Sequence, residues 1–105
     1  MKEGLVAIYR WNVAEEHVPE FRKRWREVTA SLRRYGALGS LLGRSSKGEF
    51  VAVALWPDGE TRETIFAAAD DGKPWPPSER FEPILVTPSD DMWDLTGWRE
   101  LFDGD

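Results

Sequence analysis

The segment that most restricts how this chain can fold is residues 49–56, EFVAVALW, in which every position from Phe50 to Trp56 is apolar. The run is rich in β-branched and aromatic residues and is followed by Pro57, so it is typical of a β-strand. Successive side chains of a strand point to opposite faces of a sheet, so this strand is apolar on both faces. Both faces of its sheet therefore need a cover.

The rest of the chain predicts a simple order of elements. Between residues 15 and 35, apolar side chains recur every three or four positions, as on one face of an amphipathic helix: Val18, Phe21, Trp25, Val28, Leu32 and Tyr35. Pro19 suits the first turn of that helix, and Gly36 is expected to end it. The other predicted elements are strands at 4–13, 37–45 and 81–87 and a short helix at 60–69 with Asp58 as its N-cap.

This β-α-β-β-α-β order indicates an α+β, ferredoxin-like fold with a four-stranded antiparallel sheet. Two helices can cover only one face of such a sheet. The simplest cover for the other apolar face is the sheet of a second copy, so we predict a homodimer whose sheets pack face to face.

The length of the chain fits one domain, residues 1–105. Residues 70–80, DDGKPWPPSER, form a Pro-rich loop that either covers a pocket as a lid or is a long surface connection. Residues 89–105 form an acidic, Trp-containing tail, which we expect to be packed because disordered tails rarely carry so much apolar surface.

Composition excludes several kinds of site and partner. The chain has no cysteine and a single histidine, His17, so one chain has no disulfide, thiolate site or multi-imidazole site. Its acidic doublets lack the spacing of a metal-binding loop, so we expect no metal. The net charge of −5 argues against nucleic-acid binding, although residues 1–50 hold ten Lys/Arg and only six Asp/Glu.

We also expect no membrane segment, because no apolar run approaches the roughly 18 residues of a membrane span. The N-terminus lacks the features of a signal peptide, so we expect a cytoplasmic protein.

Three phrases of the chain carry a resemblance to a known family. They are the helix phrase FRKRWREVT, the strand opening GALGS and the strand ending VALWP. Together with the order of elements over residues 4–88, they resemble antibiotic biosynthesis monooxygenase-type proteins of the dimeric α/β-barrel superfamily. The resemblance implies a pocket between each subunit's sheet and its own helices. It also implies oxidation of a small hydroxylated aromatic by O₂ without a prosthetic group, since some members need no metal or flavin.

The chain departs from both better-defined groups of that family. Trp56 matches the tryptophan that closes the third strand in the anthrone-type oxygenases, but their accompanying asparagine and tyrosine are replaced by Ala52 and Arg62. The polar and aromatic positions of the haem-degrading members hold Tyr9, Thr64 and Pro74 instead. His17 lies at the start of the first helix, where it is poorly placed as an axial ligand, so we expect no cofactor.

The candidate pocket residues are Trp56, Tyr9, Asn12, Arg44 and Arg62. Aromatic rings could hold a flat substrate, although ordinary core packing is the more usual role of such rings. Arginine and asparagine donors could hold a phenolate or quinone oxygen, although strand ends usually meet water. No catalytic residue is identified. Two other functions stay open: a non-catalytic dimer that binds small molecules or assists another enzyme, and an isomerase or lyase on the same scaffold.

Overall fold

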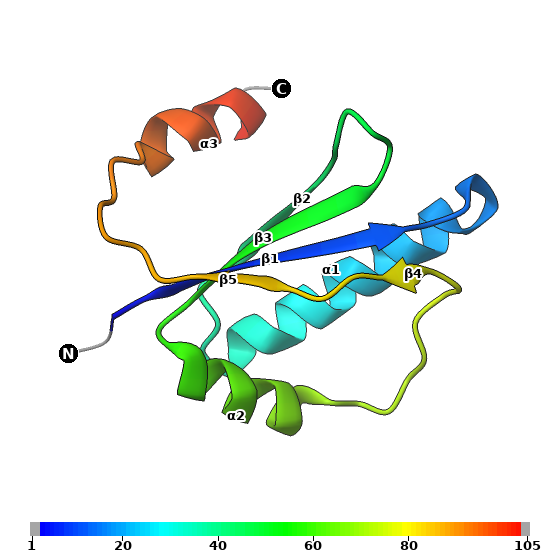
Figure 1. Ribbon diagram of the computed structural model, residues 1–105, viewed down its shortest axis with the longest axis horizontal. Helices are drawn as coiled ribbons and strands as arrows, with labels where there is room; N and C mark the ends of the chain where they lie inside the picture. The colour runs from blue at the N-terminus through cyan, green and yellow to red at the C-terminus, as the bar shows by residue number, and fades with distance from the viewer. Residues whose placement is uncertain (1–2, 104–105) are drawn as a thin grey trace.

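The computed structural model describes residues 3–103, which form one antiparallel sheet with its two longer helices on one side and a shorter C-terminal helix on the other (Figure 1). The elements in chain order are β1 (Leu5–Asn12), the 3₁₀ turn η1 (Glu15–His17), α1 (Val18–Arg34), β2 (Ser40–Arg44), β3 (Phe50–Trp56), α2 (Gly59–Ala69), β4 (Glu79–Arg80), β5 (Ile84–Val86) and α3 (Leu95–Asp103).

The strand order is β2-β3-β1, with β4 and β5 both paired to the far edge of β1, and all pairings are antiparallel. This arrangement confirms the predicted ferredoxin-like fold. The single strand predicted at 81–87 is instead two short strands on either side of Pro83. The strand is interrupted at Pro83 because proline has no N–H to donate to the neighbouring strand. Between β4 and β5, the backbone N–H of Phe81 still donates to Arg10 O at 3.1 Å.

The core lies between the sheet and its two covering helices. Alternate residues of β1 and β3 point into it, directly opposite one another in the register, so Leu5 faces Trp56 and Tyr9 faces Ala52. Phe21 from α1 and Ile65 from α2 complete the buried set. The sheet residues in that set are Leu5, Ala7, Tyr9, Trp11, Phe50, Ala52, Ala54 and Trp56.

Helix α1 begins and ends close to the predicted positions. Pro19 lies in its first turn, and Gly36 follows the C-cap with φ +114°, a conformation that suits glycine. The N–H groups of Gly36 and Ala37 donate to the carbonyls of Arg33 and Leu32 at 3.1 and 3.0 Å, which closes the helix end. Tyr35 was expected in the buried stripe, but as the C-cap it leaves that face and is 54% exposed.

Asp58 caps α2 as predicted. Its Oδ1 accepts a hydrogen bond from the backbone N–H of Thr61 at 2.7 Å, while the backbone of Asp58 is extended. The cap fixes where α2 starts, and one turn later the helix presents Arg62 towards β1.

The second face of the sheet carries an apolar row with no helix over it in the described protomer. The row crosses β2, β3, β1 and β5 at paired positions, with one residue from each strand: Leu41, Val53, Ile8 and Ile84. Leu41 and Ile84, at the two ends of the row, are 42% and 46% exposed. We call this surface the open face.

The C-terminal tail forms a helix that its own protomer leaves largely exposed. Its residues form α3 after a long connection, and Figure 1 shows α3 above the strands whereas α1 and α2 lie below them. Its apolar side chains are not packed, since Trp98 is 48% exposed and Phe102 is 63% exposed. The nine-residue helix α3 therefore does not pack on the hydrophobic core of its own chain. No helix within residues 3–103 has both the length and the apolar character that crossing a membrane requires.

Candidate functional site

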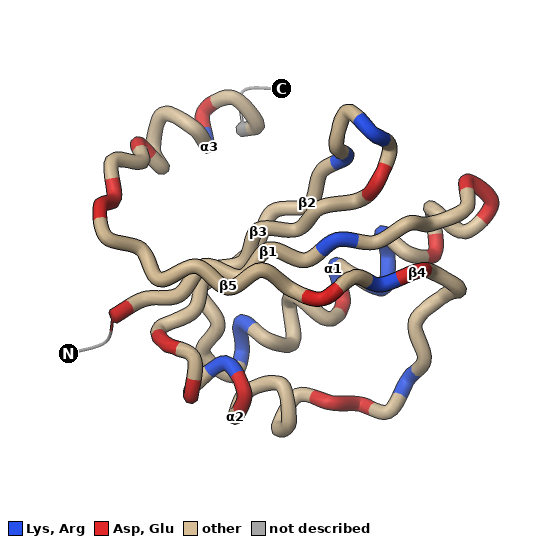
Figure 2. The backbone as a smooth tube through the Cα atoms, in the orientation of Figure 1, with Lys and Arg blue, Asp and Glu red and all other residues tan. Residues whose placement is uncertain are grey.

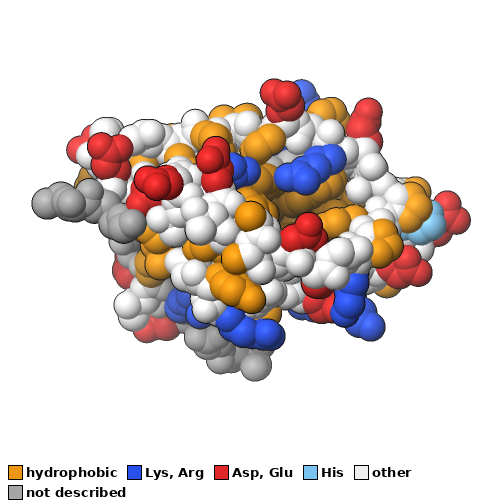
Figure 3. Space-filling model, turned by 90° about the horizontal axis from the view of Figure 1, so that it is seen from below, with side chains coloured by type: hydrophobic (Ala, Val, Ile, Leu, Met, Phe, Trp, Pro, Cys, Tyr) orange, Lys and Arg blue, Asp and Glu red, His pale blue; other side chains and the backbone are white. Residues whose placement is uncertain are grey.

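A cavity of about 770 Å³ lies between the sheet and the helices. Its walls come from α1, β1, β3, α2 and the loop at 70–80. Viewed from the helix side, the surface is hollowed, with hydrophobic side chains inside the hollow and Lys or Arg beside it (Figure 3). This volume lies in the range of pockets that bind small molecules, so the cavity is the candidate site.

Aromatic rings make up much of the wall. Tyr9 packs edge-on against Phe66 with ring centroids 6.3 Å apart, and Phe66 packs against Trp56 at 5.2 Å. Trp75, from the loop, stacks on Trp11 with centroids 6.1 Å apart and planes 19° apart. Such a wall offers flat apolar surfaces to a flat ligand.

One polar pair interrupts the aromatic wall. Arg62 Nε donates a hydrogen bond to the hydroxyl oxygen of Tyr9 at 2.9 Å, and both side chains line the cavity. The guanidinium carbon of Arg62 also lies over the rings of Tyr9 and Phe66, at 5.5 and 4.9 Å from their centroids. Because the tyrosine oxygen accepts from Arg62, its own proton is left to donate to a third group. The pair therefore presents a positive charge and an O–H donor together.

The strand and helix that supply this pair explain why it forms. Tyr9 points to the helix side because it shares the alternating buried face of β1 with Ala7 and Trp11. Arg62 reaches it from the first turns of α2, whose start is fixed by the Asp58 cap. The contact joins residues 53 positions apart in the chain.

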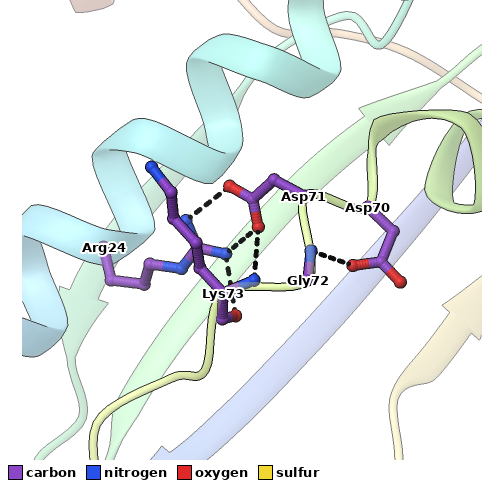
Figure 4. A network of polar contacts seen from close by, with 5 residues as sticks. All are labelled: Arg24, Asp70, Asp71, Gly72 and Lys73. Carbon is purple, nitrogen blue, oxygen red and sulfur yellow. Dashed lines mark hydrogen bonds and ion pairs between the residues drawn. The ribbon is translucent and has the colours of Figure 1, made fainter.

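The loop at 70–80 is tied to α1 by a two-pronged ion pair (Figure 4). Arg24 Nη1 and Nη2 donate to the two carboxylate oxygens of Asp71 at 3.0 and 2.7 Å, and Nη2 also donates to Lys73 O at 3.1 Å. The hydrogen bonds from Arg24, followed by the backbone N–H of Lys73, hold the pKa of Asp71 well below its usual range. The Asp71 hydrogen bond also raises the pKa of Arg24. We call this contact the loop clasp.

The clasp holds Trp75 over the cavity. Arg24 lies 5.8 Å from the Trp75 ring centroid, and Trp75 also packs against Phe21 at 5.6 Å. Asp70 Oδ1 accepts from Gly72 N at 2.9 Å, which shapes the turn between the clasp and α2 (Figure 4). The loop is thus one wall of the cavity.

Three of the five predicted pocket residues meet in this cavity: Trp56, Tyr9 and Arg62. Asn12 does not; it lies at the exposed end of β1, where its Nδ2 donates to Glu79 Oε1 at 2.7 Å. Arg44 pairs with Glu15 at 2.9 Å and lies over the Phe50 ring, in a separate groove. Asn12 and Arg44 therefore make surface contacts at the ends of their strands, which is the alternative to a pocket role that the sequence left open.

Several lining residues were not predicted, among them Arg24, Arg33, Phe66 and Lys73. The cations outnumber the carboxylates in the described lining, which holds only Asp70 and Asp71, and Asp71 is already paired in the clasp. The cavity therefore favours a neutral or anionic ligand over a cationic one.

The described lining of the cavity offers few ligands for a metal ion or for haem. Within residues 3–103, no three His, Cys, Asp or Glu side chains cluster as metal ligands would. His17 lies outside the cavity lining, near Glu16, and the described lining has no methionine. The only phenol in that lining, Tyr9, already accepts a hydrogen bond from Arg62. The usual axial ligands of haem iron, imidazole, thiolate and thioether, are therefore missing from this wall, so the residues do not fit haem.

Comparison with known proteins identifies the fold. No protein-family model matches the chain, and no curated protein matches it in sequence. Among solved structures, SnoaB from Streptomyces nogalater, a cofactor-independent oxygenase, superposes with a TM-score of 0.65 at 19% identity, covering 86% of this chain and 97% of SnoaB.

Two further neighbours have the same fold. One is a putative antibiotic biosynthesis monooxygenase from Caulobacter crescentus (TM-score 0.62, 14% identity, 85% of this chain and 92% of that one). The other is the haem degrader MhuD from Mycobacterium tuberculosis (TM-score 0.61, 24% identity, 85% and 99%). The chain thus has the fold of antibiotic biosynthesis monooxygenase-like proteins.

Proposed function

We propose that this protein is a monooxygenase that oxidises a small hydroxylated aromatic with O₂ and without a prosthetic group. The observation that carries the proposal is the Tyr9–Arg62 pair, set at 2.9 Å in an aromatic-walled cavity of about 770 Å³. The same fold in a cofactor-independent oxygenase supports it. The lack of usual haem ligands in the described lining favours this reaction over haem degradation.

The pair supplies what such a reaction first needs. A hydroxylated aromatic or anthrone must lose a proton before it can reduce O₂. Arg62 favours the ionised form of a bound phenol or enol, because a cation nearby stabilises the anion. The free Tyr9 O–H donates to the same oxygen and orients the ring, while the proton leaves to solvent.

The aromatic wall serves the next steps. The substrate anion transfers one electron to O₂, and the resulting radical pair joins to form a C–O bond. Protonation and loss of water then leave a carbonyl at that carbon. For anthrone the balance is C₁₄H₁₀O + O₂ → C₁₄H₈O₂ + H₂O, so O₂ is the only oxidant. Trp56, Phe66 and Trp75 hold the ring flat and keep water away from the radicals.

We further propose that the working unit is a homodimer joined through the open face. The row Leu41–Val53–Ile8–Ile84 is apolar across the whole width of the sheet, and monomeric proteins rarely leave such a surface in water. The cavity lies on the other side of the sheet, so each protomer keeps a complete pocket.

Oxygen uptake with anthrone as the probe tests the function. Purified protein free of metal and flavin is expected to consume O₂ faster than anthrone alone in buffer, and Arg62→Gln is expected to lose most of that excess. Arg34→Gln removes the same charge from an exposed position outside the cavity and serves as the matched control.

The other functions predict different results. Binding of anthrone without excess uptake would favour the non-catalytic dimer. A changed substrate isomer with no O₂ consumed would favour an isomerase. Either result would contradict the proposal.

A further inference from the structure

The helix α3 lacks a partner within its own chain although its sequence requires one. Leu95, Trp98 and Phe102 recur on one face, and the rings of Trp98 and Phe102 already pair at 5.2 Å. All three side chains are about half exposed or more. Isolated helices shorter than about 12 residues are marginal in water, and α3 has nine, so it needs an apolar surface to pack on.

The segment that carries α3 is also acidic. Asp90, Asp91, Asp94 and Glu100 lie in the tail, against the single cation Arg99 (Figure 2). Asp94 caps the helix, since its Oδ1 accepts from Gly97 N at 2.8 Å and its carbonyl accepts from Trp98 N at 3.0 Å. A surface that receives this helix should therefore combine apolar contacts with positive charge.

Outside the candidate cavity, one groove of the described chain has that combination, and it shares only Trp25 with the cavity lining. A groove of about 410 Å³ runs between α1 and the edge strand β2. Trp25 and Leu42 are among its apolar lining, and its charged lining is Arg22, Arg26 and Arg44. No carboxylate lines it. Arg44 is paired with Glu15, so Arg22 and Arg26 give the groove its positive charge, opposite to that of the acidic tail. We call it the α1–β2 groove.

The chain does not place its own α3 there. In Figure 1, α3 lies above the strands, whereas α1, one wall of the groove, lies below them. The connection from β5 leaves the sheet at the edge away from β2. In a dimer joined through the open faces, α3 projects from the side of the sheet on which the second copy lies.

We propose that α3 of one protomer docks in the α1–β2 groove of a second copy of this chain. Trp98 and Phe102 then contact Trp25 and Leu42, and the acidic residues of the tail face Arg22 and Arg26. The helix also covers the outer edge of β2, whose backbone groups are unpaired on that side. This inference rests on the dimer proposed above and adds an exchanged arm to it.

Cysteine cross-linking tests the proposal cleanly because the natural chain has no cysteine. Two single variants, Leu101→Cys on α3 and Leu42→Cys in the groove, are co-expressed with different affinity tags and oxidised. We expect a disulfide-linked pair that carries both tags. A chain with both substitutions should also form linked dimers.

Charge reversal supplies the second readout. Arg22→Glu with Arg26→Glu should lower the cross-linked yield about tenfold, because like charges then meet across the contact. Lys23→Glu makes a similar change on α1 outside the groove and should leave the yield unchanged. Circular dichroism confirms that each variant is folded.

Several outcomes would overturn the inference. An internal disulfide in the double variant, with no linked pair, would mean that α3 packs on its own chain. A stable dimer with no cross-link would mean that α3 docks elsewhere or binds another protein, and it would leave the proposed oxygenase unaffected. A monomer by light scattering would overturn both the exchanged arm and the open-face dimer.

Discussion

Replacing Tyr9 by phenylalanine tests the polar pair with little change in packing. The Tyr9 ring is only 7% exposed and packs against Trp11 and Phe66 at 6.1 and 6.3 Å, contacts that phenylalanine keeps. What disappears is the oxygen that accepts from Arg62 at 2.9 Å and the proton it offers to a ligand. A hydrogen bond to a charged group contributes about 1.5–3 kcal/mol.

The two losses are measured separately. Arg62 is only partly buried and can turn to water, so the free energy of unfolding should fall by about 1.5 kcal/mol, the lower limit of that range. A phenolic ligand loses its own hydrogen bond with Tyr9, so its Kd should rise roughly 10- to 100-fold. Urea denaturation measures the first quantity, and calorimetric titration with 1-naphthol measures the second.

Tyr35→Phe is the matched control, because it removes the same hydroxyl from a side chain that is 54% exposed and lies outside the cavity. It should change the free energy of unfolding by less than about 0.5 kcal/mol and leave the Kd unaltered. Equal affinity of Tyr9→Phe and the natural protein for 1-naphthol would refute the assignment of Tyr9 as the ligand's donor.

Three further predictions concern the clasp, the core and the open face. Asp71→Asn should speed hydrogen exchange at residues 70–78, because it removes the charge that Arg24 binds. The pKa of Asp71 is lowered, so in the natural protein the clasp should hold from pH 7 down to 3.8, the ordinary pKa of an aspartate, and weaken only well below that pH. Exchange that rises already near pH 5 would contradict this. Phe21→Ala should lower the free energy of unfolding, measured by urea denaturation, by about 3–5 kcal/mol, because Phe21 is fully buried. A decrease of less than about 1 kcal/mol would contradict the assignment of Phe21 to the core. Val53→Asp should convert the dimer to a folded monomer by light scattering, and an intact dimer would exclude the open face as the interface.

The element order and the faces of the sheet could be predicted because they follow from short-range periodicity. Alternation predicted that the strand at 49–56 is apolar on both faces, and the structure places one of those faces, with Trp56, in the cavity wall beside Tyr9. The apolar character of the opposite face was equally visible in the sequence.

The contacts that complete the site could not be predicted from periodicity. Arg62 was a candidate through the family resemblance alone, and its pairing with Tyr9 depends on how α2 is rotated against the sheet. The clasp joins Arg24 to Asp71 across 47 positions, and nothing near either residue indicates the other. Asn12 and Arg44 share the residue types of a binding site, but each lies at a strand end beyond the cavity.

The tail shows the limit of composition as a guide. Its tryptophans and leucines predict a segment that needs packing, but composition does not say against which chain. The apolar side chains of α3 are exposed in the described protomer, which is the result expected if their partner is a second copy.

The most direct test of the central claim is mass spectrometry of the product formed from anthrone under ¹⁸O₂ by protein free of metal and flavin. The account predicts anthraquinone with one labelled oxygen, formed faster than in buffer, with most of the excess rate lost in Arg62→Gln. An unlabelled product, or labelled quinone formed no faster than without protein, would contradict the assignment of this cavity to O₂-dependent oxidation.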